Sequence, residues 1–212
     1  MILIFIYSPL NAHEYFFDIF FRGIPGGNAK LTVDYQVDTV FASFIINSSG
    51  FVDTFFKVRD TTIVVASYPD FFTLFFDKRI NEGKYKARRE FNVKNIQHKE
   101  LPYPVRDEYT TMIMLLDPLY FSVDSVLVSL WDRKDSVTVP LFLSKAGKEI
   151  INSPAGTFPT FVYKPSNDLK NLIKDSSNSK IWISETLPPL PVQMQIHLKY
   201  GSILCVLKKV IR

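Results

Sequence analysis

The chain has 212 residues, of which 47% are hydrophobic and 15% aromatic, and it carries a net charge of +4 with a pI near 9.0. This length is typical of one all-β domain, and the Phe-rich aromatic fraction favours sheets because aromatic side chains fit a pleated surface. The basic residues are too dispersed for a dedicated nucleic-acid-binding protein, in which Lys and Arg form dense patches, so we expect no nucleic-acid partner.

The chain starts with a short apolar run, Ile2 to Tyr7, which is followed by Ser8 to Ala12. An apolar segment that ends in small residues resembles the end of a secretory signal peptide. We therefore expect residues 1–12 to be a truncated signal peptide, residues 13–212 to form a single β-rich domain, and the protein to be periplasmic or secreted. The alternative is that the run forms a first strand. No stretch approaches the roughly 18 consecutive apolar residues of a membrane-spanning helix.

Alternation of apolar and polar residues with a period of two dominates the first half of the chain and predicts strands. Residues 15–21 and 31–37 alternate on either side of Gly23–Gly27, which predicts a hairpin because Gly and Pro favour a tight turn. Residues 51–56 are consistent with either a helical turn or a buried crossover. Further strands are predicted over residues 40–46, 61–66, 71–80 and 84–93.

One main helix is predicted to begin at Asp117–Pro118, because Asp is preferred at the N-cap and Pro at the first helical position. Apolar residues then follow helical spacing up to Leu130. A short second helix is predicted over residues 169–174. The remaining strands are predicted at residues 137–143, 158–163, 181–184, 192–200 and 203–210, the last two forming a hairpin. The fold class is therefore mainly β, with a strongly curved antiparallel sheet or incomplete β-barrel and one main helix.

Short motifs follow one another in a fixed order: Gly23–Ala29, Phe55–Asp60, Asn81–Tyr85, Asp117–Tyr120, Ala155–Phe158, Ile181–Ser184, Leu190–Val192 and Gly201–Ile203. In that order they resemble the bacterial family DUF3108, a domain of unknown function, over nearly all of the chain after residue 13. The resemblance implies an exported or envelope-associated β protein. It implies no activity, cofactor or catalytic residue.

The sequence contains no pattern of catalytic or metal-binding residues. His13, His98 and His197 lie far apart and lack the spacing of metal ligands, and there is no Gly-x-Ser-x-Gly nucleophile elbow. Cys205, the single cysteine, lies in an apolar strand where a buried structural thiol is expected. We therefore expect a protein that is not an enzyme and that has no cofactor and no metal.

A basic cluster is the most informative polar feature. Lys84, Lys86 and Arg88 alternate along a predicted strand and would form a cationic stripe about 14 Å long on one face. One interpretation is contact with lipid headgroups, lipopolysaccharide or acidic glycan, and the other is a solvated face that discourages edge pairing. Arg59 and Asp60 are adjacent, and we expect them not to pair because neighbouring strand residues face opposite sides.

Aromatic residues occupy both faces of several predicted strands. Phe72 and Phe76 lie on the second face of a strand whose first face is also apolar, as do Phe16, Phe20 and Phe142 in theirs. In a curved sheet, one of these faces could line a cavity for a lipid-like ligand. The alternatives are an ordinary core and a self-association surface.

The function predicted from the sequence is a non-enzymatic exported module that binds a hydrophobic ligand or an envelope component, such as a lipid, a glycan or an envelope protein. A structural or assembly module is the first alternative, and it predicts a large exposed apolar patch. An envelope hydrolase is the second, and it requires clustered carboxylates or histidines with shifted pKa values in a cleft.

Overall fold

The computed structural model describes residues 12–95, 105–132, 137–165, 179–198 and 201–212. Within these ranges the strands are β1 (His13–Phe21), β2 (Ile24–Tyr35), β3 (Thr39–Ser48), β4 (Arg59–Ser67), β5 (Thr73–Glu82), β6 (Tyr85–Asn92), β7 (Ser125–Asp132), β8 (Val137–Ser153), β9 (Gly156–Pro165), β10 (Lys180–Ser184), β11 (Pro191–Leu198) and β12 (Gly201–Ile211). The helices are α1 (Gly50–Phe55), α2 (Glu108–Met114) and the 3₁₀-helix η1 (Val93–Asn95).

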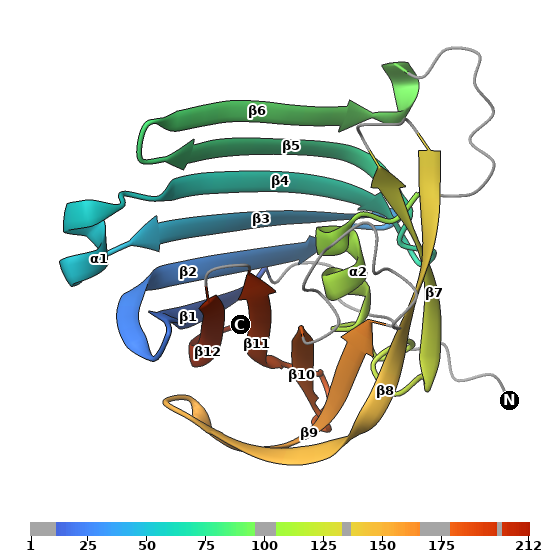
Figure 1. Ribbon diagram of the computed structural model, residues 1–212. Coiled ribbons are helices and arrows are strands. Elements are labelled where there is room, and N and C mark those ends of the chain that lie inside the picture. Colours follow the sequence, from blue (N-terminus) through green and yellow to red (C-terminus); the bar gives the residue numbers. More distant parts are fainter. Residues whose placement is uncertain (1–11, 96–104, 133–136, 166–178, 199–200) are drawn as a thin grey trace, which may run out of the picture.

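The strands form one antiparallel sheet in the order β6-β5-β4-β3-β2-β1-β12-β11-β10-β9-β8-β7. Strands that are neighbours in the sheet also follow one another along the chain, except for β1 and β12. Figure 1 shows the sheet curling around α2, with β6 and β7 as its two edges. The predicted fold class, a mainly β, strongly curved sheet that does not close, is confirmed.

The alternation in the sequence places one face of each strand toward the inside of the curl. In β4, Thr62, Val64 and Ala66 are buried while the residues between them are half-buried. Val64 lies opposite Ala42 of β3 and Phe76 of β5, and all three side chains have no exposed surface. Burial of apolar side chains in this register fixes which face of the sheet is inside, because a shift by one residue would turn the apolar side chains outward.

Helix α2 fills the inside of the curl. Its five residues Thr110–Met114 are all buried, and fully burying an apolar side chain stabilises the fold by about 1.5–3 kcal/mol. Asp107 caps the helix, because its carboxylate accepts the N–H groups of Tyr109 (2.8 Å) and Thr110 (2.9 Å). The second carboxylate oxygen accepts the hydroxyl of Thr73 at 2.7 Å, which joins the helix to the first residue of β5.

The prediction that a helix begins at Asp117–Pro118 is wrong. Helix α2 ends at Met114, and the carboxylate of Asp117 accepts the N–H of Leu119 (2.8 Å) in a turn that precedes β7. Asp followed by Pro also favours turns, and the Val-rich stretch beyond it suits a strand because branched side chains lose rotamer freedom in a helix. Val126 accordingly pairs with Leu143 of β8.

The hairpin predicted around Gly23–Gly27 is present, but its turn is only two residues long. Arg22 and Gly23 have positive φ angles of 50° and 79°, as a tight hairpin turn requires, and β2 begins at the next residue. Gly27 lies within β2, where an added Cβ would meet the carbonyl oxygen of Asn47 at 2.2 Å. Glycine is needed there because β2 and β3 approach closely.

Other predictions meet the structure unevenly. Residues 51–56, left open between two interpretations, form α1 and the residue after it. The last two strands pair as β11 and β12, and Cys205 is buried, which raises the pKa of its thiol to about 12. Residues 1–11 of the predicted signal peptide, the helix at residues 169–174 and His98 lie outside the described residues. No helix in the described part of the chain is long and apolar enough to cross a membrane.

Candidate functional site

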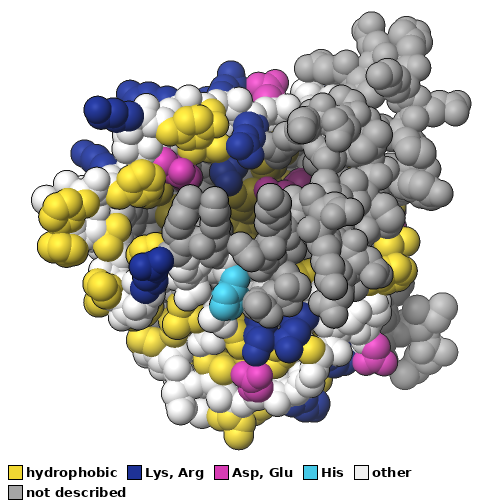
Figure 2. Space-filling model, in the orientation of Figure 1, with side chains coloured by type: hydrophobic (Ala, Val, Ile, Leu, Met, Phe, Trp, Pro, Cys, Tyr) yellow, Lys and Arg dark blue, Asp and Glu magenta, His cyan; other side chains and the backbone are white. Residues whose placement is uncertain are grey.

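Exposed aromatic side chains gather at the end of the sheet where α1 follows β3. On α1, Phe51 and Phe55 are 69% and 74% exposed, and their ring centroids lie 4.7 Å apart. Phe56, which follows the helix, and Tyr85, the first residue of β6, are both at least half exposed. Figure 2 shows hydrophobic side chains projecting on the left, where Figure 1 places α1. We call Phe51, Phe55, Phe56 and Tyr85 the aromatic tip.

The turn between β5 and β6 brings Phe56 close to Tyr85. Gly83 in this turn has a φ of +59°, and a Cβ added to it would lie 3.3 Å from the ring of Phe56. The ring of Phe56 therefore rests on the turn that leads into Tyr85. The N–H of Gly83 donates to the carbonyl of Lys57 at 2.7 Å, and Val58 pairs with Glu82. Backbone contacts thus join the segment after α1 to the β5–β6 turn.

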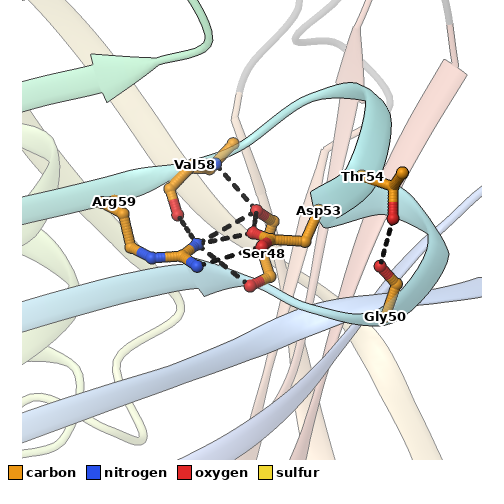
Figure 3. Close-up of polar contacts among 6 residues, drawn as sticks. All are labelled: Ser48, Gly50, Asp53, Thr54, Val58 and Arg59. Atoms are coloured by element: carbon orange, nitrogen blue, oxygen red, sulfur yellow. Dashed lines mark hydrogen bonds and ion pairs between the residues drawn. The ribbon is translucent and has the colours of Figure 1, made fainter.

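A polar network fixes α1 on the sheet (Figure 3). The guanidinium of Arg59 donates to both carboxylate oxygens of Asp53, at 2.7 and 3.2 Å, and to the carbonyl of Ser48 at 3.1 Å. The hydroxyl of Ser48 donates to Asp53 and accepts the N–H of Val58 at 2.8 Å. Hydrogen bonds from Arg59 and then from Ser48 lower the pKa of the Asp53 carboxyl, so the carboxylate is the form that holds the network.

This network matters because α1 buries no side chain that would anchor it in the core. The helix is six residues long, buries no residue, and its N-cap Ser49 makes no side-chain cap. Isolated helices of this length are unstable in water, and α1 meets the sheet at β2, where the N–H of its N-cap residue Ser49 donates to the carbonyl of Gly26 at 3.0 Å. The side chains of Phe51 and Phe55 are mostly exposed and add little to the core. They are therefore available for contacts at the surface.

The charged side chains that border the aromatic tip and remain unpaired are cationic. Lys57, Lys84 and Lys86 are exposed, and their side chains make no salt bridge or hydrogen bond to any described residue. The two nearby acids are engaged elsewhere: Asp53 pairs with Arg59, and Glu82 shares a hydrogen bond with Asp60. We call these three lysines the cationic border.

The structure divides the predicted cationic stripe. Lys84 lies in the turn and Lys86 near the start of β6, and both belong to the cationic border. Arg88 instead pairs with Asp77 (2.9 Å) and Glu90 (2.8 Å), and hydrogen bonds from Arg88 lower the pKa of the nearly buried Asp77 carboxyl. Arg88 therefore has a structural role, which joins β6 to β5.

The predicted aromatic residues lie elsewhere. Phe76 is fully buried, and its ring centroid is 5.8 Å from that of Tyr109, so it belongs to the core that α2 covers. Phe72 is half-buried with the guanidinium of Arg106 at 4.6 Å from its ring centroid. Phe72 precedes β5 while Lys84 follows it, so the whole strand separates Phe72 from the cationic border.

Inside the curl, behind the aromatic tip, two acidic side chains lie side by side. Asp60 is buried, faces away from Arg59 and accepts the N–H of Asn81 at 2.8 Å, as expected for neighbouring strand residues that do not pair. Burial raises the pKa of the Glu82 carboxyl, and so do the charge of Asp60 and their shared hydrogen bond. Lys78 donates to the hydroxyl of Tyr109 at 2.8 Å, which links this cluster to α2.

The residues of the aromatic tip and Lys57 were missed as site residues in the sequence. The sequence does contain a clue to the aromatic tip. Phe51, Phe55 and Phe56 lie between a predicted strand and Arg59, and they do not alternate as strand residues do. A pattern alone does not distinguish aromatic residues that face the core from aromatic residues that face solvent. Among the described residues no group of three or more His, Cys, Asp or Glu side chains is arranged to hold a metal ion.

Fold and site together define a mainly β protein with an open, strongly curved sheet and an exposed aromatic end. The chain belongs to the family described as "Protein of unknown function (DUF3108)", whose family model matches residues 17–208. The resemblance seen in the ordered sequence motifs is thereby confirmed.

Two solved structures are similar over nearly the whole chain. One is a β-barrel-like protein of the domain of unknown function DUF1849 from Brucella abortus, with 10% identity, a TM-score of 0.48, and coverage of 96% of this chain and 98% of that one. The other is a "putative lipoprotein" from Parabacteroides distasonis, with 11% identity, a TM-score of 0.36, and coverage of 97% of each chain. Neither match bears on function at this degree of similarity. A comparison with curated proteins found no match.

Proposed function

We propose that this protein is a non-enzymatic module of the bacterial cell envelope that binds an anionic lipid surface through the aromatic tip and its cationic border. One observation carries the proposal: α1 buries no residue, yet a network around Arg59 holds it in place with Phe51 and Phe55 exposed. Export to the envelope is supported by the apolar run at the N-terminus, which resembles a signal peptide.

The chemistry of the aromatic tip suits the boundary between lipid headgroups and acyl chains. Aromatic rings are favoured there, and a hydroxyl such as that of Tyr85 can remain in the polar layer. Each lysine of the cationic border adds about 1 kcal/mol near an anionic surface, and each phenylalanine adds up to about 1.5–3 kcal/mol if it is fully buried. The sum is typical of reversible attachment, and its electrostatic part falls as salt rises.

An exposed apolar patch is also what an assembly module would present to a protein partner. The cationic border distinguishes the two proposals, because lysine is depleted from protein interfaces whereas anionic lipid attracts it. Lys57, Lys84 and Lys86 adjoin the aromatic tip, so we favour lipid as the partner.

Co-sedimentation with vesicles tests the proposal. The protein should sediment with phosphatidylglycerol-containing vesicles, bind pure phosphatidylcholine vesicles weakly, and lose most of the binding at high salt. The double variant Phe51→Ser/Phe55→Ser and the double variant Lys84→Glu/Lys86→Glu should each reduce binding about tenfold or more, because each removes on the order of 1.4 kcal/mol or more.

Matched controls come from exposed positions away from the aromatic tip. Ile150 in β8 is 72% exposed and Lys94 in η1 is exposed, so Ile150→Ser and Lys94→Glu should leave vesicle binding unchanged. The proposal of lipid attachment through this end is wrong if the parent protein does not bind anionic vesicles. It is also wrong if the control variants lose binding as the aromatic-tip variants do. A protein partner that the Phe51→Ser/Phe55→Ser variant no longer binds would then support the assembly module.

A further inference from the structure

A second surface with apolar and cationic side chains lies away from the aromatic tip. An open depression of about 550 Å³ is bounded by the end of β12, the β8–β9 turn and the residues before β11, and it is lined by Ala155, Phe158, Leu190, Lys208, Lys209, Val210 and Arg212. Glu14 near the start of β1 pairs with Ile211 of β12, whereas the far end of β1 enters the Arg22–Gly23 turn. Strand β2 begins after that turn, and the N-cap residue Ser49 of α1 donates its N–H to the carbonyl of Gly26 in β2 at 3.0 Å, so the two surfaces lie at opposite ends of β1.

The floor of the depression is apolar and continuous with the core. Leu190 is 6% exposed and belongs to the core, against which Ala155, Phe158 and Val210 pack as partly buried side chains. These side chains form an apolar surface that the described residues leave partly exposed to solvent. An acyl chain laid on it would remove apolar surface from water, which is favourable.

A β-bulge brings two lysines to the depression. Consecutive residues of a strand normally face opposite sides, but the register between β1 and β12 shifts at Phe16/Phe17, and Lys208 is the extra residue. Such bulges redirect side chains, and both Lys208 and Lys209 accordingly line the depression. The ammonium of Lys208 donates to Asp18 at 3.0 Å.

The remaining cations of the depression have no acidic partner. Lys209 and Arg212 are exposed and make no salt bridge to any described residue. The nearest acids on β1 are already paired, Asp18 with Lys208 and Glu14 with Lys30. An anion placed at this rim would therefore gain two cationic partners without displacing an existing ion pair.

We propose that this depression binds a single-chain amphiphile with an anionic head group, such as a fatty acid or a lysophospholipid. The acyl chain lies along Phe158, Leu190 and Val210, and the carboxylate or phosphate meets Lys209 and Arg212. The volume of the depression falls within the range of about 300–1,000 Å³ that is usual for small-molecule sites. This site is distinct from the aromatic tip and does not depend on attachment to a vesicle.

Fluorescence of 11-(dansylamino)undecanoic acid tests this site on the full chain. The probe should brighten on binding, and laurate or lysophosphatidylglycerol should displace it, whereas the neutral detergent dodecyl maltoside should not. The double variant Lys209→Glu/Arg212→Glu should weaken probe binding at least tenfold, and Phe158→Ser should weaken it several-fold. Lys94→Glu serves as the charge control and should bind the probe as the parent does.

The outcomes separate this proposal from attachment to lipid surfaces. The Phe51→Ser/Phe55→Ser variant should bind the probe normally although it binds vesicles more weakly than the parent. Circular dichroism of Phe158→Ser checks that the variant is folded, and Lys209→Glu/Arg212→Glu provides a test at exposed positions. The proposal is overturned if the parent does not bind the probe, or if dodecyl maltoside displaces it as well as laurate does. It is also overturned if the double charge variant binds like the parent. Displacement by laurate but not by lysophosphatidylglycerol would assign the site to carboxylates.

Discussion

The two α-helices of the described chain have opposite relations to the core. Helix α2 buries five consecutive residues, whereas α1 buries none. Both are held by a carboxylate, but Asp107 binds the backbone and hydroxyls inside the curl while Asp53 binds the guanidinium of Arg59 at the surface. The difference teaches that α2 stabilises the fold, whereas α1 exposes side chains at the surface, where we propose that they bind lipid.

The largest expected effect is near the C-terminal end of α2. Ile113 has no exposed surface, so Ile113→Ala leaves a cavity and should lower the free energy of unfolding by about 2–5 kcal/mol. Urea unfolding followed by circular dichroism measures this change. A loss below about 1 kcal/mol would mean that α2 packs too loosely to stabilise the sheet.

A smaller effect is expected where the two regions meet, at Glu82. Its pKa is raised by burial and by the charge and hydrogen bond of Asp60, while Lys78 and Arg89 oppose the shift. A carboxyl whose pKa is raised in the folded state stabilises most below its ordinary value of 4.5, and this stability is lost as pH rises through the folded-state pKa.

The urea midpoint of the parent should accordingly fall between pH 4.5 and neutrality more than that of Glu82→Gln, which keeps a hydrogen-bonding side chain without the charge. Control measurements on Asp38→Asn, which removes one negative charge at an exposed position, correct for the change in net charge. Parallel pH profiles for the parent and Glu82→Gln would show that the pKa of Glu82 is not raised in the folded state.

A local effect is expected from the anchor of α1. Arg59→Met removes the donor that Asp53 and the Ser48 carbonyl share, so amide hydrogen exchange should accelerate across residues 50–55 and not in α2. Mass spectrometry of exchanged peptides resolves the two helices. Unchanged exchange in α1 would mean that contacts other than this network hold the helix.

The smallest effect on stability is expected at the aromatic tip. Phe55 is 74% exposed, and surface substitutions away from special contacts change stability by about 0.5 kcal/mol or less, so Phe55→Ala should unfold like the parent. The same variant should bind anionic vesicles more weakly. A clear loss of stability would instead assign Phe55 to the fold.

The sequence predicts most of the sheet and little of the site, for physical reasons. Alternation in the β1–β2 hairpin reflects burial of one face, and burial gives a strong periodic signal. Helix α2 gave no such signal because five consecutive residues, Thr110–Met114, are buried and leave no polar face there, and Asp117–Pro118 favoured a helix where the chain makes a turn. Of the cationic border, the sequence predicted Lys84 and Lys86 but not Lys57. The cationic border lies next to Phe51 and Phe55 because the β5–β6 turn contacts the segment after α1. This contact joins residues that are far apart in the sequence, so no local pattern predicts it.

Depth of insertion tests the central claim most directly. Tryptophan at position 55, introduced as Phe55→Trp, should shift its emission to the blue on phosphatidylglycerol-containing vesicles and be quenched by brominated acyl chains, after subtraction of the signal of the parent. Tryptophan introduced as Ile150→Trp, at an exposed position of β8, should show neither change. Emission from position 55 that stays at its aqueous wavelength while the protein is bound to vesicles would contradict attachment through the aromatic tip.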